Sequence, residues 1–217
     1  MDLNQARFNM IEQQIRPWEV LDPQVLALLS VVRREDFVPL AHKALAFVDM
    51  EIPLGNGQVM LAPRVQARLL QDLALQKTDK VLEVGTGSGF MAALLAHQAA
   101  SVLSLEIDAG LATQAQKNLY KAGVENVTVR QADGSQGAAA DGPFDAILLS
   151  GSVAEVPQAL LAQLKVGGRL VAIVGQEPMM RATVVTRTSE TAFTTTQPWD
   201  VNTARLAGFN EPSRFAF

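Results

Sequence analysis

The sequence predicts an α/β fold, in which a mostly parallel sheet carries helices on both faces and a helical cap lies at the N-terminus. Three observations support this prediction. From about residue 64 onward, strand-like and helix-like hydrophobic patterns alternate along the chain, which is typical of a parallel sheet covered by helices. A glycine-rich turn directly follows the first of these strands. The first 46 residues show helical periodicity instead.

The N-terminal part is expected to form helices that cover the rest of the domain. Met10, Ile11 and Ile15 fit one face of an amphipathic helix, which Pro17 should end. Asp22 followed by proline is a typical helix start and opens a second helix. Residues 49–63 contain two glycines and two prolines with little periodicity, so this stretch is expected to be a loop.

The core should begin with a helix over 64–74, followed by alternating strands and helices. We expect strands at 80–84, 101–106, 127–131, 144–149 and 169–174, and helices at 88–98, 109–122 and 156–164. Residues 183–187 and 192–196 are rich in β-forming residues and favour an antiparallel hairpin at the sheet edge. The aromatic tail, residues 208–217, is expected to pack back onto the domain, although docking elsewhere stays open.

We expect one domain rather than two. The 217 residues and the hydrophobic content of 48% suit a single full core. Within residues 1–217 we distinguish a helical cap at 1–48, a loop at 49–63 and an α/β core at 64–217.

A ligand-binding turn is predicted where the first strand ends. The strand runs into E-x-G-x-G-x-G, with Glu83, Gly85, Thr86, Gly87 and Gly89 at its defining positions. Glycines allow a sharp turn and close approach of a ligand to the backbone. A P-loop would need a Lys and a Ser or Thr after the glycines, and nicotinamide and flavin enzymes use G-x-G-x-x-G; neither pattern is present. An apolar strand entering this motif is how many methyltransferases hold S-adenosylmethionine. The Glu83 carboxylate would balance the cationic end of that cofactor.

Carboxylates after the next two strands extend the expected cofactor site. Glu106 ends the second strand, where Rossmann-type folds bind a ribose diol, and Ile107 follows it. Asp108 is expected to cap the next helix. Asp133 and Gly134 follow the third strand, where the carboxylate would accept a hydrogen bond from an adenine amino group. The alternatives for these positions are a solvated charge and a plain turn.

Composition argues against several other functions. The net charge is -4, which does not favour binding to nucleic acid. The chain has no cysteine, and His42 and His97 lie far apart, so we expect no metal site. No apolar run is long enough to cross a bilayer and the N-terminus lacks signal-peptide features. We therefore expect a cytoplasmic protein without membrane contact, present as a monomer or weak dimer.

Several blocks resemble the protein-L-isoaspartate O-methyltransferase family, and the resemblance covers most of the chain. The most specific block is AFVDMEIPLGNGQ at 46–58, which is similar to the family pattern AY-x-D-x-x-LPIG-x-GQ. Further matches are RREDFVP at 33–39 and the motifs at 83–89, 133–134, 143–145, 156–157, 163–164 and 167–168. The resemblance implies a seven-stranded, Rossmann-like methyltransferase fold. It also implies methyl transfer from S-adenosylmethionine to isoaspartyl residues of damaged proteins or peptides.

The chain departs from this family on the acceptor side. After G-x-G-Q the family usually reads T-I-S-Q-P and uses the Ser hydroxyl in its active site, whereas here Val59, Met60 and Leu61 follow. One hypothesis is that backbone groups of this loop position the acceptor. The others are a different methyl acceptor, or a protein that binds the cofactor without catalysis. Ser150, near the end of the fourth strand, is expected either to face the methyl group or to cap the next helix.

Overall fold

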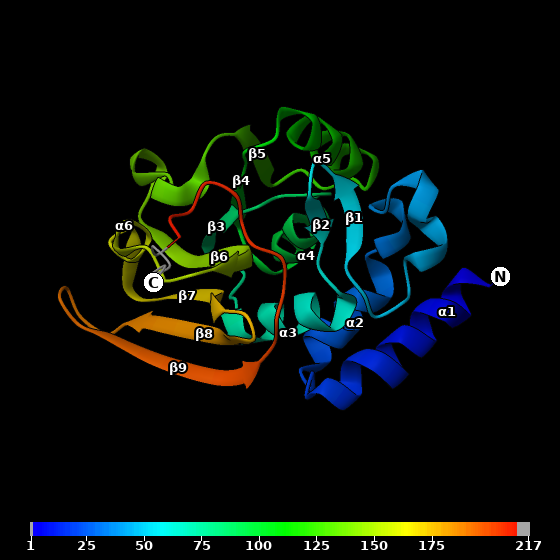
Figure 1. Cartoon of the computed structure of the whole chain (residues 1–217), viewed down its shortest axis with the longest axis horizontal. Coiled ribbons are helices and arrows are strands. Elements are labelled where there is room, and N and C mark those ends of the chain that lie inside the picture. The colour runs from blue at the N-terminus through cyan, green and yellow to red at the C-terminus, as the bar shows by residue number, and fades with distance from the viewer. Residues whose placement is uncertain (1, 212–217) are drawn as a thin grey trace, which may run out of the picture.

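The computed structural model describes residues 2–211 and contains a seven-stranded sheet, as the family resemblance implied (Figure 1). The strand order is β5-β4-β3-β6-β7-β8-β9. The strands are β3 (Lys80–Val84), β4 (Ser101–Glu106), β5 (Val127–Gln131), β6 (Phe144–Val153), β7 (Leu164–Gln176), β8 (Met179–Arg187) and β9 (Phe193–Asp200). The first five in spatial order run parallel, and β8 and β9 form the predicted antiparallel hairpin at one edge.

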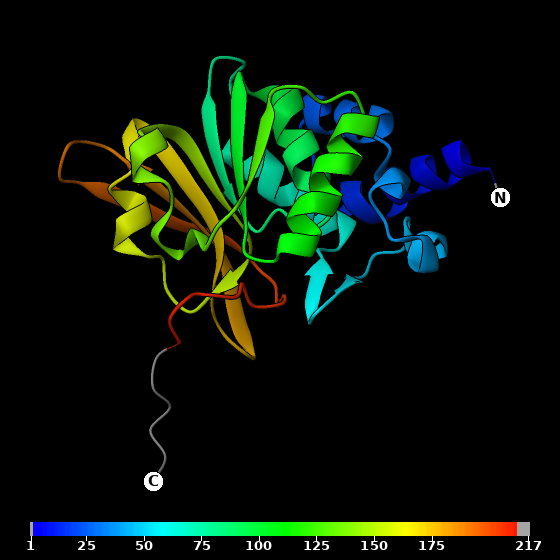
Figure 2. The same cartoon turned by 90° about the horizontal axis from the view of Figure 1, so that it is seen from above.

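Helices cover both faces of this sheet (Figure 2). One face packs against α3 (Pro63–Leu73), α4 (Phe90–Gln98), α5 (Ala109–Lys121) and the N-terminal cap. The other face packs against the short α6 (Gln158–Leu161) and the chain after β9. Neighbouring strand residues therefore serve opposite faces: Val81 belongs to the first hydrophobic cluster and Leu82 to the second.

The predicted cap is helical but irregular. It consists of α1 (Leu3–Met10), a π-helical turn (Ile11–Ile15), α2 (Pro23–Val31) and 3-10 turns at Arg16–Trp18, Arg34–Asp36 and Leu40–Leu45. Met10, Ile11 and Ile15 are buried together, as their periodicity predicted. Asp22 caps α2 by accepting a hydrogen bond from the Gln24 N–H at 2.8 Å.

The prediction of a loop over 49–63 was wrong, because this stretch contains a β-hairpin. Strands β1 (Ile52–Gly55) and β2 (Gln58–Met60) pair antiparallel. Asn56 and Gly57 connect them with φ values of 52° and 74°. An Asn-Gly pair adopts this left-handed geometry easily and is a strong hairpin signal.

Two further predictions need correction in their extent. The helix expected over 156–164 covers only Gln158–Leu161, because β7 begins at Leu164, which pairs with Phe144 of β6. Strands β6 and β7 also extend beyond their predicted ends. The start of the tail packs back onto the domain as predicted: Phe209 contacts the second hydrophobic cluster and Glu211 pairs with Arg205 at 2.6 Å. The rest of the tail, 212–217, lies outside the described residues.

Candidate functional site

The glycine turn lies at the carboxyl end of β3, as predicted. Gly85, Gly87 and Gly89 have φ values of 93°, 53° and 87°, a region that favours glycine. A Cβ atom at Gly85 would lie only 2.6 Å from a methyl group of Leu206. At Gly87 it would lie 3.1 Å from Leu54 of the hairpin. The turn is thus covered by two elements that are distant in sequence.

Glu106 ends β4 beside the glycine turn and stabilises the conformation of this turn. Its carboxylate accepts hydrogen bonds from the Gly87 N–H at 2.7 Å and the Asp108 N–H at 3.0 Å. A carboxylate has about four acceptor positions, so Glu106 retains some for a ribose diol. Asp108 caps α5 as predicted, by accepting from the Leu111 N–H at 2.9 Å. Its other oxygen accepts from the Asn56 amide at 2.8 Å, which ties the hairpin to α5.

Glu83 lies beneath the turn and not on its open side. The side chain is 0% exposed, and its two oxygens accept hydrogen bonds from Ser104 at 2.6 Å and Ser150 at 2.7 Å. Burial raises the pKa of Glu83 to about 7, against the opposing effect of these two hydrogen bonds. Glu83 does not line either of the two small cavities beside the turn. Its contact with a cationic ligand stays a prediction.

Ser150 is not a helix cap. It lies within β6, which continues to Val153, and α6 begins only after Pro157. Its half-buried hydroxyl lines a small cavity of about 20 Å³ beside the glycine turn. The same cavity is lined by Val59, Met60, Leu61, Gln66, Gly85, Thr86, Gly87, Ser88 and Met91. All four acceptor-side candidates thus meet the cofactor turn at one place.

A second cavity of about 20 Å³ lies on the other side of the turn, where the adenosine was expected. Its lining includes Glu106, Ile107 and Gly134, together with Leu206 from the chain after β9. Gly134 is required here because a Cβ atom would lie 2.3 Å from Val84. Asp133 is exposed and accepts a hydrogen bond from the Ser135 N–H at 2.9 Å. Its position is compatible with both the adenine contact and the turn.

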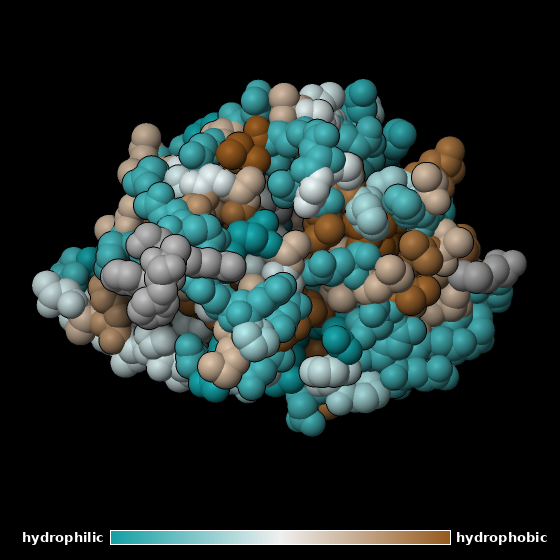
Figure 3. Space-filling view, in the orientation of Figure 1, coloured by the Kyte–Doolittle hydropathy of each residue, from teal (hydrophilic) through white to brown (hydrophobic). Residues whose placement is uncertain are grey.

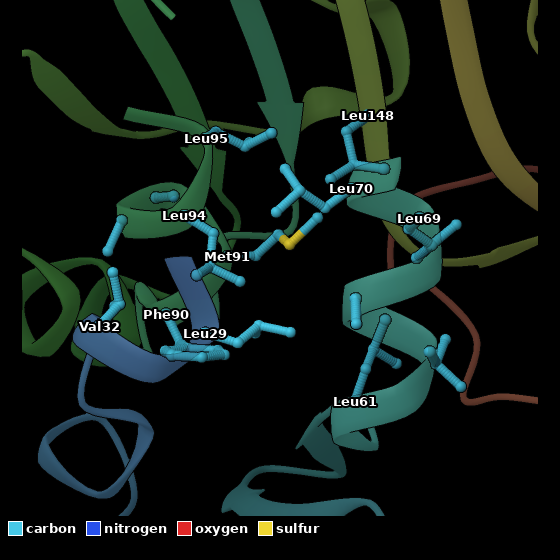
Figure 4. Close-up of a cluster of buried hydrophobic side chains, with 14 of the residues drawn as sticks. Leu29, Val32, Leu61, Leu69, Leu70, Phe90, Met91, Leu94, Leu95 and Leu148 are labelled. Atoms are coloured by element: carbon cyan, nitrogen blue, oxygen red, sulfur yellow. The ribbon is translucent and has the colours of Figure 1, made fainter. Parts of the chain in front are cut away.

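The side chain of Leu61 belongs to the hydrophobic core. It is 4% exposed and points into the cluster between α2, α3 and α4 (Figure 4). Its carbonyl oxygen accepts a hydrogen bond from the buried Arg34 guanidinium at 2.8 Å. Arg34 also donates to Gln66 and to the Ala46 carbonyl, and burial lowers its pKa to about 9. The acceptor-side loop is therefore held from behind by a buried cation.

Two segments close the site from above. We call residues 203–209 the C-terminal strap; it is joined to β6 by hydrogen bonds between Ser152 and both Ala204 and Leu206, each of 2.9 Å. The β1–β2 hairpin covers the other side, and apolar side chains gather on the surface over the hairpin and the cap (Figure 3). The glycine turn, the Glu106 carboxylate and the hydroxyls beside the turn are chemically suited to S-adenosylmethionine.

A larger cavity of about 620 Å³ lies next to this site. It lies between the cap and α5, and its lining includes Leu54 and Asn56 of the hairpin region, Ser88 and Asp108. Sequence reasoning missed this groove, and it also missed Ser104, Gln66 and the strap. These residues carry no motif that marks them, since tertiary contacts alone bring them to the turn.

Within residues 2–211, no group of three or more His, Cys, Asp or Glu side chains is placed to hold a metal ion. The helices of this part of the chain are all too short or too polar to span a membrane.

Comparison with known proteins identifies the family. A family model described as protein-L-isoaspartate(D-aspartate) O-methyltransferase matches residues 5–204. A protein-L-isoaspartate O-methyltransferase of Methanoculleus marisnigri is 43% identical over 169 residues, which is 78% of this chain and 77% of the relative. Another, from Rhodopseudomonas palustris, is 40% identical over 200 residues and 92% of each chain.

A solved structure shows the same fold. It is a Plasmodium falciparum protein, described as a protein-L-isoaspartate O-methyltransferase in complex with S-adenosyl-L-homocysteine. The two chains superpose with a TM-score of 0.77 over 94% of this chain and 97% of the other, at 18% identity. The Rossmann-like methyltransferase fold is thereby confirmed. Together with the match over residues 5–204, these findings show that the chain belongs to the protein-L-isoaspartate(D-aspartate) O-methyltransferase family.

Proposed function

We propose that this protein is an S-adenosylmethionine-dependent O-methyltransferase that methylates a carboxylate of isoaspartyl residues in damaged proteins. One observation carries the proposal: the glycine turn separates two small cavities, one lined by Glu106 and Gly134 and the other by the acceptor-side loop. This is the order needed to place adenosine, methyl group and acceptor in sequence. The names of the relatives, and the S-adenosyl-L-homocysteine bound by the Plasmodium falciparum protein, point the same way.

Each part of the site has a role in this reaction. When bound, S-adenosylmethionine supplies an electrophilic methyl group on a sulfonium. Gly85 and Gly87 would let the backbone approach the cofactor, Glu106 would accept from its ribose, and Asp133 and Gly134 would border the adenine. An isoaspartyl carboxylate is already an anion at neutral pH, so the protein needs to align it and not to deprotonate it.

The acceptor would be positioned without the family's Ser hydroxyl. Arg34 fixes the Leu61 carbonyl, so the backbone of this loop is oriented from behind. Ser88 also lines the same cavity, whereas the single proton of Ser150 is donated to Glu83. These features support positioning of the acceptor by the backbone of the loop and by Ser88, and they do not call for a different acceptor.

The test is methyl transfer from labelled S-adenosylmethionine to an isoaspartyl peptide and to its aspartyl twin. We expect label in the isoaspartyl peptide alone, as a base-labile methyl ester. Equal labelling of both peptides would contradict isoaspartyl specificity. If neither peptide is labelled while the cofactor binds, the reaction itself is wrong.

The setting of the protein is part of the proposal. We propose that it acts on proteins and peptides in the cytoplasm, where S-adenosylmethionine is available, as a monomer or weak dimer. Sedimentation over a range of concentrations tests the oligomeric state. A stable dimer at the lowest concentration would contradict it.

A further inference from the structure

The tip of the β1–β2 hairpin carries the only Asn-Gly pair in the sequence, Asn56-Gly57. Gly55 pairs with Gln58, so these two residues form the whole turn, and both are exposed. A Cβ atom at Gly57 would meet open space. Among residues 2–211, no carbonyl accepts a hydrogen bond from the Gly57 N–H. The backbone nitrogen of Gly57 is therefore uncrowded beside the Asn56 side chain.

This arrangement favours deamidation of Asn56. The Gly57 nitrogen bonds to Cγ of Asn56 and loses its proton, while ammonia leaves and a succinimide ring forms. Water then opens the ring on either side of the nitrogen. Opening at the main-chain carbonyl of Asn56 gives an isoaspartyl residue with a free α-carboxylate, and opening at Cγ gives an aspartyl residue. Glycine crowds the attacking nitrogen least, because it has no Cβ atom.

We propose that Asn56 is a site of spontaneous deamidation, and that the isoaspartyl residue formed there makes the damaged chain a methyl acceptor for a second copy of this protein. The inference rests on the proposed function, because it uses the same acceptor chemistry. The free α-carboxylate of residue 56 takes the methyl group from the sulfonium. An O–C bond forms and the C–S bond breaks with its electron pair staying on sulfur, which leaves a methyl ester and S-adenosyl-L-homocysteine.

Transfer between two copies follows from the place of the tip. Asn56 lines the groove of about 620 Å³ between the cap and α5, and its amide donates to Asp108 at 2.8 Å. The acceptor-side cavity is lined by Val59 and Leu61, and Asn56 is not part of it. The tip therefore lies away from the acceptor cavity of its own chain. Because it is exposed, it is open to the acceptor cavity of another molecule.

The hydrogen bond to Asp108 links deamidation to the closure of the hairpin. While the Asn56 amide donates to Asp108, it cannot rotate freely toward the Gly57 nitrogen. Hydrogen bonds from the Leu111 N–H and the Asn56 amide lower the pKa of Asp108, so its carboxyl group is ionised at neutral pH. Deamidation replaces the donor at residue 56 by a second carboxylate. The two like charges repel, and the damaged tip is released from α5.

The other positions of this kind should react more slowly. Six further asparagines, at 4, 9, 118, 126, 202 and 210, are each followed by a residue with a side chain, which crowds the attacking nitrogen. Asp-Gly pairs occur at Asp133 and Asp141. A carboxylate carries a charge that opposes attack at its carbon, and Asp141 is also held by Arg130 at 2.7 Å. These positions serve as internal controls for Asn56.

The first step of the test locates the damage. The full-length protein is aged in warm, mildly alkaline buffer, and isoaspartate is located by peptide mapping. We expect it at residue 56 of the natural protein before any other position. Asp108→Ser keeps a residue that caps helices but loses the tie to the tip, so residue 56 should deamidate about three- to tenfold faster. Asp22→Ser, at the cap of α2, is the matched control and should leave this rate unchanged.

The second step tests methyl transfer between copies. The aged acceptor chain carries Gly85→Ala, which is expected to bind the cofactor poorly, and fresh natural protein is added with labelled S-adenosylmethionine. We expect a base-labile label on the peptide that contains residue 56, at an initial rate that rises with the amount of fresh protein. An aged acceptor that also carries Asn56→Gly keeps the left-handed turn and should carry no label on this peptide.

Two results would overturn the inference. One is the absence of isoaspartate at residue 56 when other positions of the aged chain have formed it. The other is isoaspartate at residue 56 that stays unlabelled while a short isoaspartyl peptide in the same mixture is labelled. If neither the peptide nor the aged chain is labelled, the proposed function fails and the inference fails with it.

Discussion

The burial of its carboxyl group makes Glu83 costly for folding. Its pKa is raised from 4.5 to about 7, so folding favours the protonated form. The stabilising contribution of that form is complete below about pH 4.5 and is lost as the pH rises through about 7. At about pH 8, ionisation of Glu83 should cost on the order of 3 kcal/mol of unfolding free energy.

We therefore expect Glu83→Gln to stabilise the protein in a pH-dependent way. Relative to the natural protein, the unfolding free energy of the variant should be higher by about 1 to 3 kcal/mol at about pH 8 than at about pH 5. Urea denaturation at both pH values measures this difference. Carboxylates whose pKa is lowered, such as Asp145, are present in both proteins and cancel. A difference that is the same at both pH values would show that Glu83 does not titrate in this range.

Leu61 shows how one residue can belong to both the site and the core. Its side chain fills space between helices, whereas its carbonyl is fixed by Arg34. Leu61→Ser would restore the family hydroxyl but leave a cavity, and we expect a loss of about 2 to 5 kcal/mol of unfolding free energy. Urea denaturation alongside Leu61→Ala separates the cavity from the effect of the hydroxyl. A loss below about 1 kcal/mol would contradict the core role assigned to Leu61.

At the scale of elements, the β1–β2 hairpin acts as one cover of the cofactor site. The Asn56 amide ties its tip to Asp108, two residues after the carboxylate expected to hold the ribose. Asn56→Gly keeps the left-handed backbone and removes only this bond. We expect S-adenosyl-L-homocysteine to dissociate about three- to tenfold faster from the variant, because the cover opens more readily.

Stopped-flow displacement measures this rate. Glu19→Gly is the matched control, since Glu19 is also left-handed, with φ of 63°, but lies in the cap. An unchanged rate in Asn56→Gly would show that the tip does not gate the site. A faster rate in both variants would point to a general loosening of the domain.

Elements with a strong local signal were predicted well. Strands β3, β4 and β5 occupy their expected residues because each is a short apolar run between clear turns. The β1–β2 hairpin was missed although Asn56-Gly57 is a typical hairpin turn. The two strands beside this turn are short, and their residues do not alternate between apolar and polar. The bounds of the short α6 and the long β7 could not be predicted from the local sequence, because the pairing of Leu164 with Phe144 decides where β7 begins.

At the scale of the whole molecule, the glycine turn and Glu106 could be predicted because a motif and its spacing mark them. The segments that cover the site, the C-terminal strap and the β1–β2 hairpin, could not be predicted. Leu206 reaches Gly85 only because the strap folds back across β6, more than a hundred residues along the chain. Ser104 likewise becomes part of the site only through the parallel register that sets it opposite Glu83. Sequence marks the residues that touch a ligand better than those that support them.

Binding of the cofactor at the glycine turn is the claim on which the proposed activity and the proposed acceptor both depend. Calorimetric titration with S-adenosyl-L-homocysteine tests it most directly when Gly85→Ala is compared with Gly123→Ala. Both glycines have positive φ, 93° and 69°, but a Cβ atom at Gly123 meets open space. We expect one molecule to bind per chain in the natural protein and in Gly123→Ala, and a loss of more than tenfold in affinity in Gly85→Ala. Equal affinity in all three proteins, or no binding by the natural protein, would contradict the account.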